Sequence, residues 1–126
     1  MKVPENLKYT KDHEWLKVEG NESLVGISDY AQHELGDIVF IEVETVGEIL
    51  QKGESFGTIE AVKTVSDMYM PVGGEVLAFN DELTTKPETL NQDPYEAGWV
   101  VRIKVTNPDE INQLLSAADY GKLIQG

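Results

Sequence analysis

The segment GTIEAVKTVSDMYMPVGG, residues 57–74, has the β-branched residues and bounding glycines of two short strands joined by a tight turn. Its one lysine, Lys63, lies between Val62 and Thr64. The chain contains 10 Lys plus Arg against 23 Asp plus Glu, so an isolated cation in a run with few charges stands out. We predict a β-hairpin that presents Lys63 at its tip.

A short internal repeat flanks this hairpin. The sequence VGEIL at residues 46–50 resembles GGEVL at residues 73–77, and their Gly-Glu pairs lie 27 residues apart. The repeat favours two similar strand-turn halves that the predicted hairpin joins.

The remaining segments predict a mostly β chain with short helices. β-rich composition and apolar–polar alternation predict strands at residues 13–20, 23–27, 37–44 and 99–105. Residues 28–36 predict a two-turn helix that begins after an N-cap at Ser28 and stops at Gly36. Residues 80–99 are polar, contain two prolines and predict an ordered surface loop.

The C-terminal segment, residues 107–124, predicts helix. Its start signals are an N-cap at Asn107, proline at position 108 and a capping-box spacing to Glu110. Ser116 is a candidate cap for a second short helical turn. An apolar stripe is expected at Ile111, Leu114 and Leu115.

Size and composition limit the class of protein. A chain of 126 residues predicts one domain with its own core, and no apolar run is long enough to span a membrane. A net charge of −13 argues against nucleic-acid binding, which needs a basic surface. The absence of cysteine and of a presequence-like N-terminus favours the bacterial cytoplasm, with a mature mitochondrial form as the alternative.

Sequence motifs for catalysis are absent. His13-Glu14 and His33-Glu34 lack the second histidine of a zinc-protease motif, so we expect two structural or surface histidines and no metal site. No phosphate-binding loop or nucleophile elbow is present, and no carboxylate pair is singled out by its spacing. We therefore expect no catalytic residues and a protein that is not an enzyme by itself.

Lys63 then has two interpretations. A solvated lysine is protonated at pH 7 and is a poor nucleophile, which disfavours a Schiff-base role. An exposed, rigidly held lysine is instead suited to enzymatic acylation, which converts the side chain into a neutral amide tether. The alternative is an ordinary solvated turn residue.

Residues 57–80 resemble the attachment hairpin of lipoyl carriers, and specifically that of the glycine cleavage system H-protein family. The shared positions are Glu60, Val62, Lys63, Ser66, Asp67, Pro71, Gly74, Glu75 and Val76. Ala61 and Thr64 depart from the serine and alanine usual there. Matching blocks continue in family order at residues 9–15, 25–42, 52–57, 91–99 and 114–120. A generic lipoyl or biotinyl domain lacks the His-Glu-Trp and Asn-x-Asp-Pro-Tyr-x-x-Gly-Trp blocks.

The resemblance implies a fold and a cofactor. The fold is a barrel-sandwich hybrid of the lipoyl/biotinyl-domain type, mostly β with short helices and C-terminal helices, as one domain over residues 1–126. Lipoate would be joined to Lys63 by an amide. Glu60, Val62 and Thr64 would form the recognition hairpin for the lipoate-attaching enzyme.

The resemblance also implies a role in glycine catabolism and one-carbon metabolism. The swinging lipoyl arm would take an aminomethyl group from a pyridoxal-phosphate glycine decarboxylase to an aminomethyltransferase that uses tetrahydrofolate. Dihydrolipoamide dehydrogenase would reoxidise the dithiol. The protein would act as a monomeric, non-catalytic carrier.

Members of this family fold the loaded arm into a surface cleft. Glu14, Ile27 and Asp67 match positions near that cleft, and we predict that they line it. A carboxylate wall would favour the charged form of an aminomethyl amine. Two alternatives stay open: a relay protein for lipoyl or octanoyl groups, and an unmodified acidic adaptor.

Overall fold

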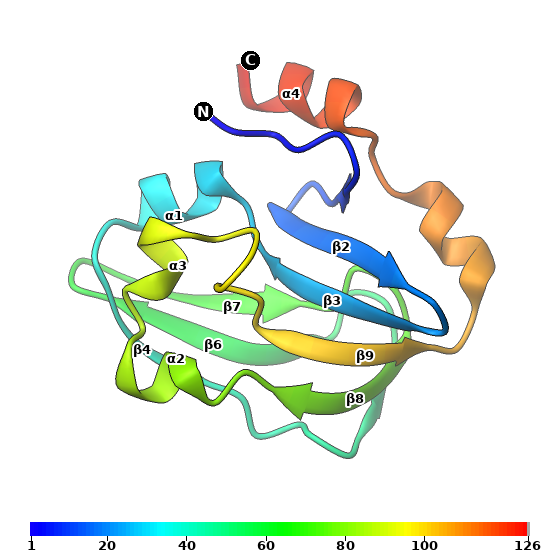
Figure 1. The fold of residues 1–126 in the computed structure, drawn as a ribbon, viewed down its shortest axis with the longest axis horizontal. Helices are drawn as coiled ribbons and strands as arrows, with labels where there is room; N and C mark the ends of the chain where they lie inside the picture. The colour runs from blue at the N-terminus through cyan, green and yellow to red at the C-terminus, as the bar shows by residue number, and fades with distance from the viewer. Residues whose placement is uncertain (126) are drawn as a thin grey trace.

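Two antiparallel sheets enclose one hydrophobic core in this computed structural model, which describes residues 1–125 (Figure 1). The larger sheet has, in spatial order, β1 (Lys8–Tyr9), β2 (Glu14–Glu19), β3 (Glu22–Ile27), β9 (Val101–Val105), β8 (Gly74–Phe79) and β5 (Ile49–Leu50). The smaller sheet has β4 (Ile38–Glu42), β6 (Ser55–Ala61) and β7 (Val65–Tyr69). The predicted mostly β class with short helices is confirmed, and the described sheets are open and form a sandwich without closing into a barrel.

The central hairpin is confirmed. β6 and β7 pair antiparallel, with Glu60 opposite Val65 and Thr58 opposite Asp67. The Ala61 N–H donates to the Thr64 carbonyl at 2.8 Å, which closes the turn around Lys63. The lysine therefore lies at the end of a short, well-paired ribbon.

The two copies of the internal repeat lie side by side. β5 and β8 pair antiparallel, with Leu50 opposite Gly74. Further bonds continue the pairing, since the Gly47 N–H donates to the Val76 carbonyl at 2.7 Å and the Val76 N–H donates to the Glu48 carbonyl at 2.9 Å. Such reciprocal pairing is the arrangement expected of two halves related by a pseudo-two-fold axis.

The first helix, α1 (Asp29–Leu35), follows its predicted capping signals. The Ser28 hydroxyl accepts a hydrogen bond from the Ala31 N–H at 3.1 Å, which satisfies one of the free donors of the first turn. Gly36 ends the helix at φ 78° and ψ −152°, a conformation that is strongly disfavoured for every residue other than glycine.

The expectation of a surface loop at residues 80–99 was wrong. The segment forms α2 (Glu82–Thr85) and α3 (Thr89–Gln92), and it buries Leu83 and Leu90 in the main core. The Asn80 side chain donates to the carbonyls of Ala97 and Trp99 and closes the segment onto itself. The two leucines are seven residues apart, which is a helical spacing, but Pro87 and polar residues between them favour a loop, so local pattern alone did not reveal the two helices.

The C-terminal segment contains two helices of different kinds. The 3₁₀ helix η1 (Pro108–Gln113) begins at Asn107, whose side chain accepts from the Asp109 N–H, and α4 (Ala117–Gln125) follows. Between them, Leu115 pairs with Tyr9 through two backbone hydrogen bonds of 2.8 and 2.9 Å. This extended pairing explains why the predicted helix is interrupted.

Two further predictions for this segment had different outcomes. Ser116 caps α4, since its hydroxyl accepts from the Asp119 N–H at 3.1 Å. The capping box at Glu110 was wrong, because its carboxylate accepts from the Gly73 N–H at 2.8 Å and thereby joins η1 to the start of β8. The apolar stripe is divided: Ile111 and Leu114 pack against the main core, and Leu115 packs against a second cluster around Tyr9 and Tyr120.

No helix within residues 1–125 has the length and apolar composition needed to cross a membrane.

Candidate functional site

Lys63 is exposed at the tip of the β6–β7 hairpin, and it lies against the end of α1. A Cβ added to Gly36 would be 3.3 Å from Lys63 Cε and 3.7 Å from Nζ. The Val62 N–H donates to the Asp37 carbonyl at 2.9 Å, which attaches the turn to the loop that follows the helix. The missing side chain at Gly36 thus both ends the helix and leaves room for the lysine.

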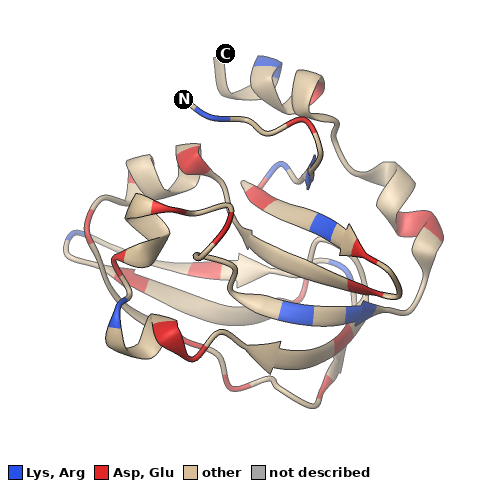
Figure 2. Ribbon diagram, viewed as in Figure 1, with Lys and Arg blue, Asp and Glu red and all other residues tan. Residues whose placement is uncertain are grey.

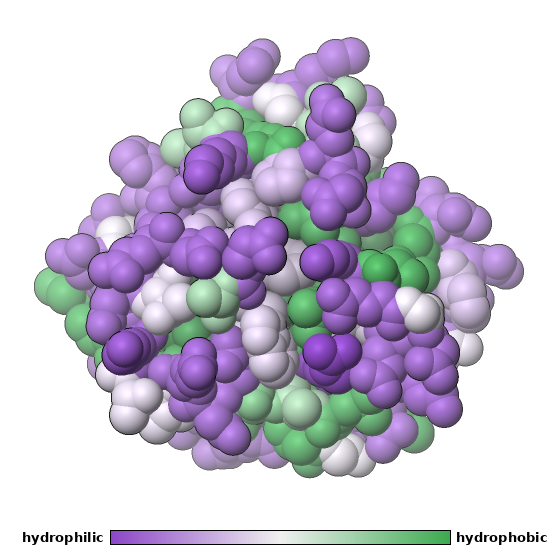
Figure 3. Space-filling model, viewed as in Figure 1, coloured by the Kyte–Doolittle hydropathy of each residue, from purple (hydrophilic) through white to green (hydrophobic). Residues whose placement is uncertain are grey.

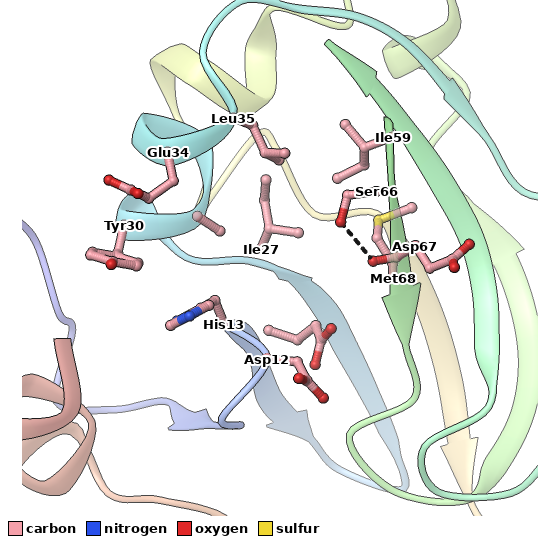
Figure 4. A pocket seen from close by; sticks show the side chains of 12 residues that line it. Asp12, His13, Ile27, Tyr30, Glu34, Leu35, Ile59, Ser66, Asp67 and Met68 are labelled. Atoms are coloured by element: carbon pink, nitrogen blue, oxygen red, sulfur yellow. Dashed lines mark hydrogen bonds between the residues drawn. The ribbon is translucent and has the colours of Figure 1, made fainter. Parts of the chain in front are cut away.

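A pocket of about 290 Å³ opens beside this lysine, between α1 and β7 (Figure 4). Leu35 and Ser66, which are close in sequence to Gly36 and Lys63, line one part of it. In Figure 4, Leu35 lies at one end and Asp12 at the other. The full lining consists of Asp12, His13, Glu14, Ile27, Tyr30, Ala31, Glu34, Leu35, Ile59, Ser66, Asp67 and Met68.

The three residues predicted for a cleft all line this pocket. Glu14 comes from β2, Ile27 from β3 and Asp67 from β7, so the fold brings together residues from three strands. Glu60, Val62 and Thr64 lie apart from the pocket and are exposed around the hairpin tip. The predicted residues therefore form two groups: one in the pocket and one around Lys63.

Glu14 is a buried carboxylate, with 2% of its surface exposed. Its Oε1 accepts from the Thr10 hydroxyl at 2.6 Å, and its Oε2 accepts from the Tyr69 N–H at 3.1 Å. Desolvation raises the pKa of Glu14 to about 7, although the hydrogen bonds from Thr10 and Tyr69 act in the opposite direction. A cation in the pocket would favour its ionised form, so the site is suited to a protonated amine.

His13 links the pocket to the C-terminal helix. Its Nδ1 lies 2.8 Å from the Tyr120 hydroxyl, which in turn lies 2.6 Å from the Ser28 hydroxyl. Its ring is tilted against Tyr30 with centroids 4.8 Å apart, and burial lowers the pKa of His13. His13 has φ 72°, an uncommon conformation for a residue other than glycine. Together these contacts connect α1, the residue before β2, and α4 at the wall of the pocket.

Sequence reasoning did not predict most of the pocket lining. Tyr30, Ala31, Glu34 and Leu35 occupy one face of α1 at helical spacing, a signal that the sequence did contain. Asp12 adjoins the predicted His-Glu-Trp block, but nothing local indicates that it lines the same pocket as Asp67. His33 is exposed, in agreement with the expectation of a surface histidine.

Almost the whole chain is similar to known proteins. The family model described as "Glycine cleavage H-protein" matches residues 7–126. The glycine cleavage system H protein of Halothermothrix orenii is 52% identical over 99% of this chain and 98% of its own length. That of Bacteroides thetaiotaomicron is 50% identical over the full length of both chains. The chain therefore belongs to the glycine cleavage H-protein family.

A solved structure has the same fold. The crystal structure of a glycine cleavage system H protein from Mycobacterium marinum superposes with a TM-score of 0.89 at 35% identity. The match covers 98% of this chain and 100% of that chain. The fold and the family assignment thus agree.

Proposed function

We propose that this protein is the lipoyl carrier of the glycine cleavage system, with lipoate joined to Lys63 as an amide. The observation that carries the proposal is the position of Lys63, at the exposed tip of a paired hairpin and next to a pocket with apolar and acidic walls. Membership of the H-protein family supports it.

The residues present fit this cofactor. The exposed amine of Lys63 is available for an amide bond, and the pocket beside it offers Ile27, Leu35 and Met68 to a hydrocarbon chain. When bound, the lipoyl group supplies the dithiol chemistry that accepts an aminomethyl group formed from glycine and later releases it to a folate-dependent enzyme. The chain itself supplies the tether point and the pocket.

The buried carboxylate of Glu14 would hold the amine of the loaded arm. Desolvation raises the pKa of Glu14 to about 7, which disfavours its ionised form relative to a solvated glutamate. An ammonium group at short range stabilises the ionised carboxylate and lowers that pKa. Asp67 lines the pocket from the facing strand as an exposed residue whose carboxylate points away from Ile27 in Figure 4, and Ile27 provides an apolar wall. In this way the pocket would shield the arm from water while the protein diffuses between enzymes.

The proposed partners follow from this role. They are glycine decarboxylase, aminomethyltransferase, dihydrolipoamide dehydrogenase and the lipoate-attaching enzyme, and the carrier catalyses no step by itself. The relatives named above are bacterial, and we propose the bacterial cytoplasm as the compartment in which these partners meet.

Intact-mass measurement on protein purified from its native cell tests the attachment. We expect a lipoyl mass increment, localised to Lys63 by peptide mapping. Protein without any increment at Lys63 would favour the unmodified adaptor. Reconstitution with the partner enzymes tests the role, because a lipoylated protein that cannot support glycine decarboxylation would instead favour the lipoyl or octanoyl relay.

A further inference from the structure

A second pocket, of about 370 Å³, has no part in the proposed function. Four segments bound it: the stretch from β1 to β2, the loop between β5 and β6, the residues that follow β7, and the end of η1 with the residues after it. We call it the second pocket, and we call the pocket beside Lys63 the first pocket. A volume of this size is within the range of about 300–1,000 Å³ that is typical of sites for small molecules.

The carboxylate of Glu14 lies at the boundary between the two pockets. Glu14 lines both of them, and its Oε2 accepts from the Tyr69 N–H at 3.1 Å. On either side of Tyr69, Met68 lines the first pocket and Met70 lines the second. Asp12 also lines both pockets. A charged group in the second pocket would therefore meet the same carboxylate as a charged group in the first.

Side chains of both charges line the second pocket. Lys11 and Lys52 line it together with Asp12 and Glu14, whereas the lining of the first pocket, as far as the structure describes it, is acidic without lysine or arginine. The two lysines are exposed and Glu14 is buried, so the cations lie at the rim and one carboxylate lies inside. The Lys52 Nζ donates to Gln113 Oε1 at 2.8 Å, which positions one cation between two segments of the wall. Acidic residues outnumber basic ones by 23 to 10 and are spread over the fold in Figure 2, so two lysines at one pocket depart from the general charge of the molecule.

The second pocket also has an apolar part. Met70 and Pro71 are buried, and Leu114 and Leu115 are half-buried beside them. On the face seen in Figure 3, hydrophobic atoms occur in separate patches among hydrophilic ones. A recess that joins four apolar side chains to charged groups of both signs is thus suited to a small amphipathic molecule.

We propose that the second pocket binds a free α-amino acid with an apolar side chain. Its ammonium group lies at the carboxylate of Glu14, and its carboxylate lies at the lysines of the rim. Its side chain packs against Met70 and the leucines that follow η1.

The buried carboxylate carries most of this argument. Glu14 is bonded to the neutral donors Thr10 and Tyr69, and the ion pairs found within residues 1–125 do not include it. A buried carboxylate is stabilised by a cation at short range, which the ammonium group of an amino acid supplies. A simple anion would be repelled by Glu14, and a simple cation would be repelled by the rim lysines. A zwitterion satisfies both.

The test is a titration of the unmodified protein with L-leucine, followed by NMR of the backbone amides and of the Glu14 side-chain carboxyl carbon. We expect saturable shifts at Lys11, Lys52 and the Glu14 carboxyl. L-Leucine should bind about tenfold or more tightly than 4-methylpentanoate, which lacks the ammonium, or 3-methylbutylammonium, which lacks the carboxylate, because each analogue loses a charge-assisted contact. Glycine should also bind more weakly, since it has no side chain to fill the apolar part.

Two exposed lysines provide a matched pair of variants. Lys52→Gln removes one cation of the rim, whereas Lys104→Gln removes a lysine of β9 that does not line the pocket. The Kd for L-leucine should rise about three- to fivefold in Lys52→Gln and stay unchanged in Lys104→Gln. Neither side chain is buried, so both variants should fold.

Other outcomes overturn the proposal. No saturable shift with L-leucine up to its solubility limit would show that the pocket is not an amino-acid site. Equal affinity for L-leucine and 3-methylbutylammonium would show that the rim lysines hold no carboxylate. Equal affinity for L-leucine and glycine would show that the side chain does not enter. None of these measurements uses lipoate, so their failure would leave the proposed function intact, and unmodified Lys63 in the native cell would leave this inference intact.

Discussion

The two sides of the β6–β7 hairpin differ in chemistry. The inner side faces the pocket that contains the buried Glu14, across from α1, whereas the outer side exposes valines and Phe40. Lys63 lies at the tip, where the two sides meet. A concave acidic pocket suits a small charged group, and an exposed apolar face suits another protein. Under the proposed function, the hairpin tip would meet the lipoate-attaching enzyme and the inner pocket would hold the arm.

Removing the acceptor amine should have the largest effect, since both sides of the hairpin depend on it. Lys63→Arg keeps the charge but cannot form the lipoyl amide, so we expect complete loss of acylation and of carrier activity. The side chain is exposed, so the midpoint of thermal unfolding should change little. Mass spectrometry and a reconstituted glycine decarboxylation assay check this. Acylation of the arginine variant at another lysine with activity retained would contradict the assignment.

The raised pKa of Glu14 offers a test of the pocket on the inner side of the hairpin, separate from any effect at Lys63. Folding raises its pKa from 4.5 to about 7, so the folded state binds the proton more tightly than the unfolded state. The free energy of unfolding should therefore fall as pH rises from 4.5 to 7, by up to about 3 kcal/mol from this group. Denaturant titrations of the unsubstituted protein and of Glu14→Gln, compared at each pH, isolate the contribution.

The control for the Glu14 experiment is the rate of acylation at Lys63, which should not depend on a residue in the pocket. Glu14→Gln should be acylated at Lys63 at the normal rate, because Glu14 is buried in the pocket wall and does not lie at the hairpin tip. A difference in stability between the two proteins that does not vary with pH would show that Glu14 does not titrate in this range.

Gly36 is the point at which the helix, the lysine and the hairpin meet. Gly36→Ala places a side chain at φ 78° and ψ −152° and 3.3 Å from Lys63 Cε, so we expect a loss of about 1–3 kcal/mol of stability. Gly20→Ala is a useful control, because its φ is also positive, at 66°, but nothing lies within 4 Å of an added Cβ. A larger fall in acylation rate for Gly36→Ala than for Gly20→Ala would confirm the role of the contact with Lys63.

Tyr120→Phe tests how far α4 supports the pocket, and its effect should be the smallest of the four. The change removes the hydroxyl that joins His13 to Ser28 and keeps the ring stacked on Tyr9 at 4.5 Å. We expect a loss of about 1–2 kcal/mol of stability by chemical denaturation. The pKa of His13, followed by NMR, should also change. An unchanged His13 titration would show that the hydroxyl does not hold the ring.

The sequence alone determined the parts that depend on neighbours in the chain. The caps at Ser28, Asn107 and Ser116 act within three residues, and the hairpin around Lys63 closes across four. Family blocks far apart in the chain predicted membership of the H-protein family, and the family model and the full-length relatives confirm that membership. Local hydrogen bonding and short turns leave signals in a few adjacent residues, which is why these features could be predicted.

The tertiary structure decided what depends on distant partners. Glu110 bonds Gly73 instead of capping its own helix, Leu115 pairs with Tyr9 and interrupts a helix, and Leu83 is drawn into the core. The pocket wall depends on a contact between His13 and Tyr120, 107 residues apart, and the exposure of both Val39 and Phe40 depends on the register shift between Ile38 and Phe40. A polar side chain can hydrogen-bond, an extended segment can pair, and an apolar residue can be buried with any of several partners. Only packing of the whole chain selects one of these partners.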